Sequence, residues 1–74
     1  MTPRLRLARR EREIADLVGN LWSYQQIAQH LGLAYESVRS CVNRIAARIP
    51  GDDDGRGAYK RLASYIQSER ANAA

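Results

Sequence analysis

Apolar residues recur along most of this chain at the three- and four-residue spacing that places side chains on one face of a helix. Four such segments predict helices at about residues 9–20, 24–31, 35–48 and 58–70. Their apolar positions, in chain order, are Ile14, Leu17, Val18 and Leu21; Tyr24, Ile27, Ala28 and Leu31; Val38, Val42, Ile45 and Ile49; and Tyr59, Leu62, Ala63 and Ile66. No segment has the pattern of a strand, so the chain is predicted to be all-α.

Helix boundaries are marked by residues that cap or end helices. Ser23 is a predicted N-cap, and Gln26 three residues later completes a capping box. Gly32 is expected to end the second helix with a positive φ. Ala34 stands where a Ser or Asp cap would be expected for the third helix, which Pro50 ends.

The spacing across Gly32 is typical of a helix-turn-helix, predicted here at residues 23–48. Ala28 must be small where the third helix crosses the second, and Gly32 must turn without a Cβ clash. An ordinary αα-hairpin does not require Ala and Gly at that separation. The agreeing positions are Ile27, Ala28, Leu31, Gly32, Leu33, Val38 and Cys41.

Seventy-four residues are expected to form a single domain, residues 1–74, near the lower size limit for a core that folds unaided. Within it we predict a basic arm at residues 1–6, a three-helix core at 7–49, an acidic loop at 50–57 and a C-terminal helix at 58–70.

If Val38, Val42 and Ile45 hold the third helix against the core, its opposite face is free. Arginine can bond guanine bidentately in the major groove of DNA, and asparagine can bond adenine. We therefore expect helix 35–48 to read bases, although a solvated face, usually richer in Glu and Lys, is the alternative. The base-reading candidates are Glu36, Arg39, Ser40 and Asn43.

The net charge of the chain also favours a nucleic acid as the partner. The formal net charge is +4, and eleven of the twelve basic residues are arginines, whose planar fork suits phosphates and base edges. With no signal peptide and no apolar run of about 20 residues, the protein is expected to be cytoplasmic and not bound to a membrane. The single cysteine, Cys41, excludes an internal disulfide and is expected to be buried. No catalytic or metal-binding constellation is present, so neither an enzyme nor a cofactor is expected.

From Leu7 to Ala63 the sequence resembles the LuxR-type (GerE-like) DNA-binding domain of bacterial transcription regulators. The matching stretches are "LARREREIADLV", "SYQQIAQHLGL" and "SVRSCVNRI". The resemblance implies a four-helix domain whose third helix enters the major groove and whose fourth mediates dimerisation. It also places the family's base-facing positions at Arg39, Ser40 and Asn43. The chain departs from the family at Leu21, usually Gly, at Ala34, usually Ser or Thr, and at Cys41, usually His.

Phosphate contacts are expected from a second group of side chains. Gln25 and Gln26 lie at the start of the second helix, where free amides and the helix dipole favour a phosphate, but Gln26 has its capping box as an alternative role. Arg44 lies on the flank of the third helix. The full set is Arg9, Arg10, Gln25, Gln26, Tyr35 and Arg44. The predicted dimer contact is Tyr59, Leu62, Tyr65 and Ile66.

These observations predict a stand-alone, sequence-specific regulator of transcription that binds double-stranded DNA, as a homodimer. One alternative is a promoter-binding or RNA-polymerase-binding factor, because "SYQQIA" and "VRS" also resemble region four of sigma factors. The other is a protein-interaction module, such as a small phage-encoded factor, built on the same fold.

Overall fold

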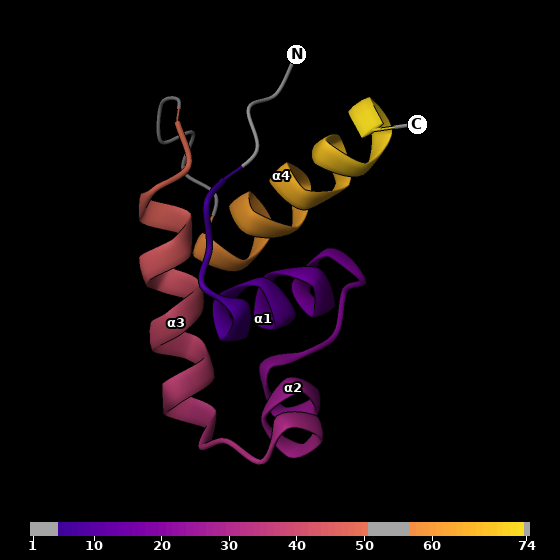
Figure 1. Cartoon of the computed structure of the whole chain (residues 1–74). Helices are drawn as coiled ribbons and strands as arrows, with labels where there is room; N and C mark the ends of the chain where they lie inside the picture. The colour runs from indigo at the N-terminus through magenta and orange to yellow at the C-terminus, as the bar shows by residue number, and fades with distance from the viewer. Residues whose placement is uncertain (1–4, 51–56, 74) are drawn as a thin grey trace.

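The computed structural model describes residues 5–50 and 57–73. Within these residues the chain forms four helices and no strand, which confirms the all-α prediction. The helices are α1 (Arg9–Gly19), α2 (Tyr24–Leu31), α3 (Tyr35–Ala47) and α4 (Ala58–Ala73) (Figure 1). The helix α4 ends three residues beyond its predicted end, whereas α1 and α3 each end one residue earlier than predicted. Residues 1–4 of the expected arm and residues 51–56 of the expected acidic loop lie outside the described part of the chain.

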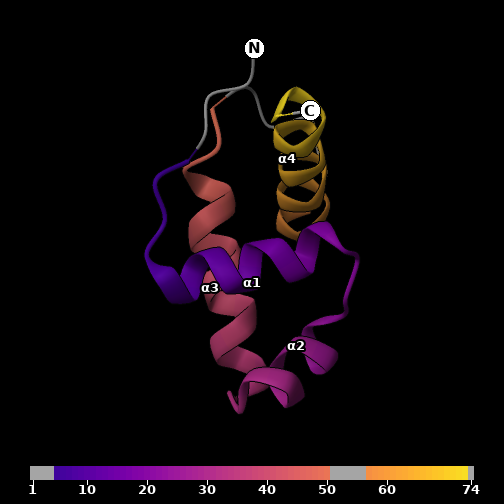
Figure 2. The same cartoon turned by 45° about the vertical axis from the view of Figure 1, so that its right-hand side comes forward.

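The helix α1 lies at the centre of the arrangement. It crosses α3 and packs against both α3 and α4, while α3 also packs against α2 and α4 (Figures 1 and 2). The helix α2 lies at the end of the molecule where α3 begins, and α4 lies at the opposite end. Of the helices in residues 5–50 and 57–73, none combines the length and apolar character needed to span a membrane.

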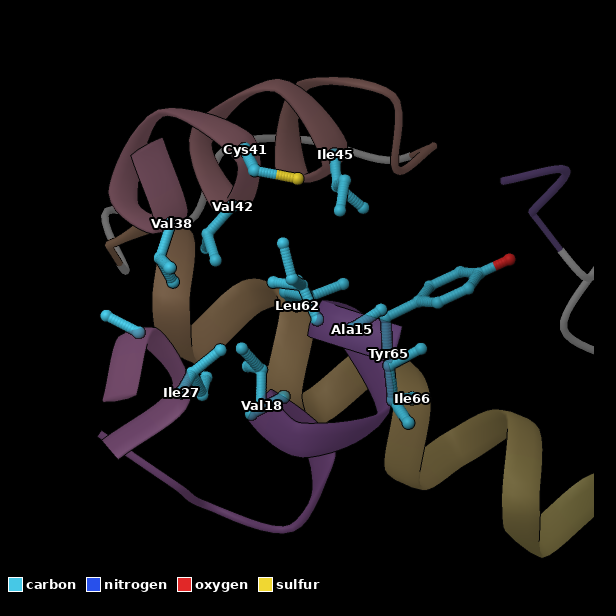
Figure 3. Packing of buried hydrophobic residues seen from close by; sticks show 13 residues of the cluster. Ala15, Val18, Ile27, Val38, Cys41, Val42, Ile45, Leu62, Tyr65 and Ile66 are labelled. Atoms are coloured by element: carbon cyan, nitrogen blue, oxygen red, sulfur yellow. The ribbon is translucent and has the colours of Figure 1, made fainter. Parts of the chain in front are cut away.

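One apolar core joins all four helices, as Figure 3 shows for most of its members. The largest fully buried side chains all belong to the apolar positions that the helical spacing predicted. Burial of each such aliphatic side chain contributes roughly 1.5–3 kcal/mol relative to an exposed one. The largest fully buried side chains are Ile14, Val18, Ile27, Val38, Val42, Ile45, Leu62 and Ile66. Cys41 is also buried, as its place in the pattern predicted.

The start of α2 forms as the sequence predicted. The Ser23 hydroxyl accepts a hydrogen bond from the Gln26 amide at 3.1 Å, and the Gln26 side-chain oxygen accepts one from the Ser23 amide at 2.8 Å. This capping box satisfies two amides that the first turn of a helix leaves without partners. The helix ends at Gly32, whose φ of 69° is in the left-handed region expected for it.

The turn between α2 and α3 is short because Gly32 reverses the chain within one residue. The Leu33 amide then donates to the Ala28 carbonyl at 2.9 Å, which closes the end of α2. Ala34 precedes α3 and supplies no side-chain cap, as expected from its missing oxygen. The direction of α3 therefore depends on the turn and on the core contacts of its inner face.

Leu21 differs from its prediction. The apolar spacing assigned it to the buried face of the first helix, but α1 ends at Gly19 and Leu21 lies in the following turn. Its φ is 67°, a left-handed conformation that is uncommon for a residue with a Cβ, and its exposed fraction is 63%.

Close packing and long-range hydrogen bonds join α1 to α4. Gly19 has no side chain where Ile66 crosses α1, since an added Cβ would overlap Ile66 Cγ2 and lie 3.0 Å from Ile66 Cβ. Arg70 donates to the Asn20 side-chain oxygen at 2.8 Å and to the Asp16 carbonyl at 3.0 Å. These contacts fix the last turns of α4 against the C-terminal end of α1.

Candidate nucleic-acid interface

The helix α3 has two chemically different faces. On the inner face, the side chains of Val38, Val42 and Ile45 have no exposed area and hold the helix against the core. Positions three, four and seven apart share a helix face, so the four predicted base-reading residues project together on the opposite side. All four are exposed: Glu36, Arg39, Ser40 and Asn43. The structure thus brings the predicted set together on one solvent-facing surface.

Arg39 is held only loosely on this face. Its Nη1 atom lies 3.8 Å from Glu36 Oε2, and both side chains are more than half exposed. Exposed ion pairs of this kind contribute between about 0 and 1 kcal/mol. Little free energy is therefore lost when the guanidinium leaves Glu36 for another partner.

Three tyrosine rings surround the start of α3. Tyr24 packs edge-on against Tyr35 at 5.8 Å and against Tyr59 at 5.5 Å between ring centroids, which links α2, α3 and α4. The Tyr59 hydroxyl donates to the Trp22 carbonyl at 2.8 Å. Burial raises the pKa of Tyr24, the neighbouring Tyr35 and Tyr59 raise it further, and Arg39 opposes them. These contacts stiffen the support beneath the first turn of α3.

The residues of α2 and α3 that are predicted to contact phosphates are all at the surface, but they differ in their interactions within the protein. Gln25 is exposed at the start of α2, and Arg44 is exposed on the flank of α3. The Gln26 oxygen is occupied by the capping box, which is the alternative that its position left open. Tyr35 is half exposed, with its ring against Tyr24.

The two predicted arginines at the start of α1 share one acidic partner. Arg9 Nε lies 3.8 Å from one oxygen of Glu13, and Arg10 Nη1 lies 3.3 Å from the other. The Arg9 side chain is 97% exposed, so this pair does not fix its position. Both guanidiniums can reach an external anion.

The predicted dimer contact requires a correction. Leu62 and Ile66 have no exposed area, Tyr65 is 8% exposed, and Tyr59 is half-buried in the tyrosine group. Figure 3 shows Leu62, Tyr65 and Ile66 on the side of α4 that packs against α1 and α3 of the same chain. They are not available at the surface as a dimer contact, because one face of α4 is covered by two helices rather than one.

The sequence reasoning missed Arg48, which connects three segments. Its Nη1 atom lies 3.5 Å from Glu11 Oε1, and its Nη2 group donates to the Arg6 carbonyl. The end of α3 is thereby bonded to the start of α1 and to the segment before it. A basic residue at the end of a helix was visible in the sequence, but its two distant partners were not.

In the ranges 5–50 and 57–73, no group of three or more His, Cys, Asp or Glu side chains is placed to hold a metal ion. The four residues on the outer face of α3 are instead suited to hydrogen bonding or ion pairing with a partner.

Comparisons with known proteins add no relative to this description. No protein-family model matches the chain. No curated protein matches it either. The search of solved structures also found no match.

Proposed function

We propose that this chain is a sequence-specific DNA-binding protein that regulates transcription, with α2, the Gly32 turn and α3 acting as a helix-turn-helix. One observation carries the proposal: Glu36, Arg39, Ser40 and Asn43 are exposed together on α3, whose opposite face is buried in the core. A single helix fits the major groove of B-DNA, so side chains on its outer face can reach base edges.

Each exposed side chain has a distinct hydrogen-bonding role in this proposal. Arg39 donates two hydrogen bonds to the O6 and N7 atoms of guanine, and Asn43 pairs bidentately with adenine. Glu36 accepts from the exocyclic amine of cytosine, and Ser40 bonds either a donor or an acceptor. When Arg39 engages guanine it gives up its 3.8 Å pair with Glu36, which costs little because both groups are solvated.

Phosphate contacts position α3 in this proposal without reading sequence. The residues proposed for these contacts are all exposed: Arg9, Arg10, Gln25, Tyr35 and Arg44. Such contacts set the register of a protein on DNA and supply most of its salt-dependent affinity. The positive formal charge of +4 supports this role.

The resemblance to LuxR-type domains, carried by "LARREREIADLV", "SYQQIAQHLGL" and "SVRSCVNRI", supports the same function. The left-handed Leu21 at the family's usual Gly position agrees with it. Two copies bound symmetrically would require a palindromic target, with half-sites about one DNA turn or a multiple of it apart.

Selection of bound duplexes from a random DNA pool tests the proposal. A consensus enriched in guanine and adenine at the positions facing α3 is the expected result, and a palindrome would indicate two bound copies. Titration of random-sequence duplex at two salt concentrations separates the protein-interaction alternative. A protein that shows no salt-dependent binding and enriches no sequence does not have the proposed function.

A further inference from the structure

The segment before α1, residues 5–8, is fixed to the distant end of α4. Glu69 Oε2 accepts a hydrogen bond from the Leu5 amide at 3.2 Å, and Glu69 Oε1 pairs with Arg12 Nη1 at 3.1 Å. Arg12 Nη2 then donates to the Leu5 carbonyl at 2.9 Å. Both backbone polar groups of Leu5 are therefore bonded to an ion pair whose side chains are only 10% and 22% exposed.

A second attachment holds the same segment beside α3. Arg48, which follows the last residue of α3, donates to the Arg6 carbonyl and pairs with Glu11. Leu5 and Leu7 pack against the core, whereas Arg6 between them is exposed. Figure 1 shows the segment running alongside the C-terminal half of α3. The alternation of inward and outward side chains directs Arg6 to the solvent next to the helix that carries the candidate interface.

We infer that residues 5–8 form a second DNA-contacting surface, and that Glu69 is a positioning residue for it. This inference rests on the proposed function. The partner is the phosphate backbone beside the groove that α3 enters, since exposed guanidiniums lie on the segment itself, at the start of α1 and on the flank of α3. These are Arg6, Arg9 and Arg44.

The role of Glu69 follows from pre-organisation. A segment that is already fixed pays little conformational entropy when it binds, whereas a released segment must be ordered by the DNA. Loss of the Glu69 carboxylate should therefore weaken DNA binding. Long-range electrostatics alone predicts the opposite result, because removing an acidic group makes the protein more attractive to a polyanion. The two explanations therefore predict changes in DNA affinity of opposite sign.

The test compares two variants with the same change in charge. Glu69→Gln removes the carboxylate that pairs with Arg12 and accepts from the Leu5 amide, and Glu13→Gln instead removes the half-buried acidic partner of Arg9 and Arg10. Affinity for a random-sequence duplex is measured by fluorescence anisotropy over a series of salt concentrations. Glu69→Gln should bind at least about threefold more weakly. The salt slope, which is the steepness of the fall of log K with log salt concentration, should be lower by about 0.9 for each phosphate that the segment no longer neutralises. Glu13→Gln should bind as tightly as the wild type or more tightly.

Arg6→Gln provides an independent variant, because its exposed side chain is not needed for folding. It should lower the salt slope by about 0.9, and its effect should shrink when combined with Glu69→Gln, since both act through the same segment. Circular dichroism at the binding temperature establishes which variants are folded. If Glu69→Gln is not folded, the salt slope of Arg6→Gln decides whether residues 5–8 contact DNA.

The outcomes separate the inference from the function on which it rests. A wild-type protein without salt-dependent binding overturns both. If the wild type binds but folded Glu69→Gln binds equally or more tightly, or if Arg6→Gln leaves the slope unchanged, the role of residues 5–8 is wrong and the proposed function of α3 stands.

Discussion

Arginines occupy two regions of this molecule, and their surroundings differ. Arg12 bonds Glu69 of α4 and the Leu5 carbonyl, and Arg70 bonds the Asn20 side chain and the Asp16 carbonyl, all at 2.8–3.1 Å. On the outer face of α3, Arg39 has one exposed partner at 3.8 Å. Arginine in the first region joins helices, whereas arginine in the second is left free to bind something else.

This contrast shows that charge alone does not identify a binding surface. A guanidinium whose donors are satisfied within the fold has little to offer a phosphate or a base. Under the proposed function, recognition belongs to α3, and the Gly19–Ile66 and Arg70 contacts between α1 and α4 serve stability. Changes in these two regions should alter different measurements, whereas a change at Glu69, which also anchors residues 5–8, should alter both.

The largest change in stability is expected from a substitution that disrupts the α1–α4 contact directly. Gly19→Ala places a Cβ against Ile66, which is fully buried and branched at its own Cβ, so neither residue can move aside. The free energy of unfolding should fall by about 2–3 kcal/mol, as for other overpacked cores. Urea denaturation followed by circular dichroism measures it. A decrease below about 0.5 kcal/mol would show that the helices separate without cost.

Substitutions at the two left-handed residues should change the free energy of unfolding by intermediate amounts and in opposite directions. Gly32→Ala should lower the free energy of unfolding by about 1 kcal/mol, because φ is 69° and nothing within 4 Å adds a steric clash. Leu21→Gly should raise it by about 0.5–1 kcal/mol by relieving a φ of 67°. Thermal unfolding of both variants measures the pair. Changes of the same sign would contradict the account of these turns.

The smallest effect concerns Tyr65, beside the Arg12–Glu69 pair. Burial raises its pKa above the ordinary value of 10.0, Glu69 raises it further, and Arg12 opposes them. Its hydroxyl is buried and bonds no atom in the part of the chain that the structure describes. Because the folded pKa is raised, the stability linked to Tyr65 is fully present below about pH 10 and is lost as the pH rises through the folded value.

Tyr65→Phe removes this pH dependence and the unpaired hydroxyl together. The variant should be as stable as the wild type at neutral pH or slightly more stable, and it should lose less stability between about pH 9 and pH 11. Tyr24 and Tyr59 also have raised pKa values, so part of the alkaline loss should remain. Urea denaturation at several pH values measures the difference, and an unchanged alkaline slope would mean that Tyr65 is not responsible.

Local chemistry made much of the fold predictable from the sequence. The Ser23 capping box, the turn at Gly32 and the inner face of α3 each depend on residues within about one or two helical turns. The outward direction of Arg39 and Asn43 follows from the same periodicity. These parts of the candidate site therefore needed no knowledge of tertiary packing.

Long-range contacts were not predictable in this way. Arg12 and Glu69 are 57 positions apart, and Arg48 and Arg6 are 42 apart, so no local pattern pairs them. Tyr65 was assigned to a dimer contact because the sequence does not show that both α1 and α3 cover α4. The anchoring of residues 5–8 depends on contacts between segments that are distant in sequence, so only the structure shows it.

The central claim is that Arg39 reads a base while Arg44 contacts only the backbone. The most direct measurement is the affinity of Arg39→Ala and Arg44→Ala for the selected duplex and for a scrambled duplex of the same composition. Arg39→Ala should lose about 1–3 kcal/mol on the selected duplex and little on the scrambled one, whereas Arg44→Ala should weaken both alike and lower the salt slope by about 1. Equal losses for both variants on both duplexes would contradict the account.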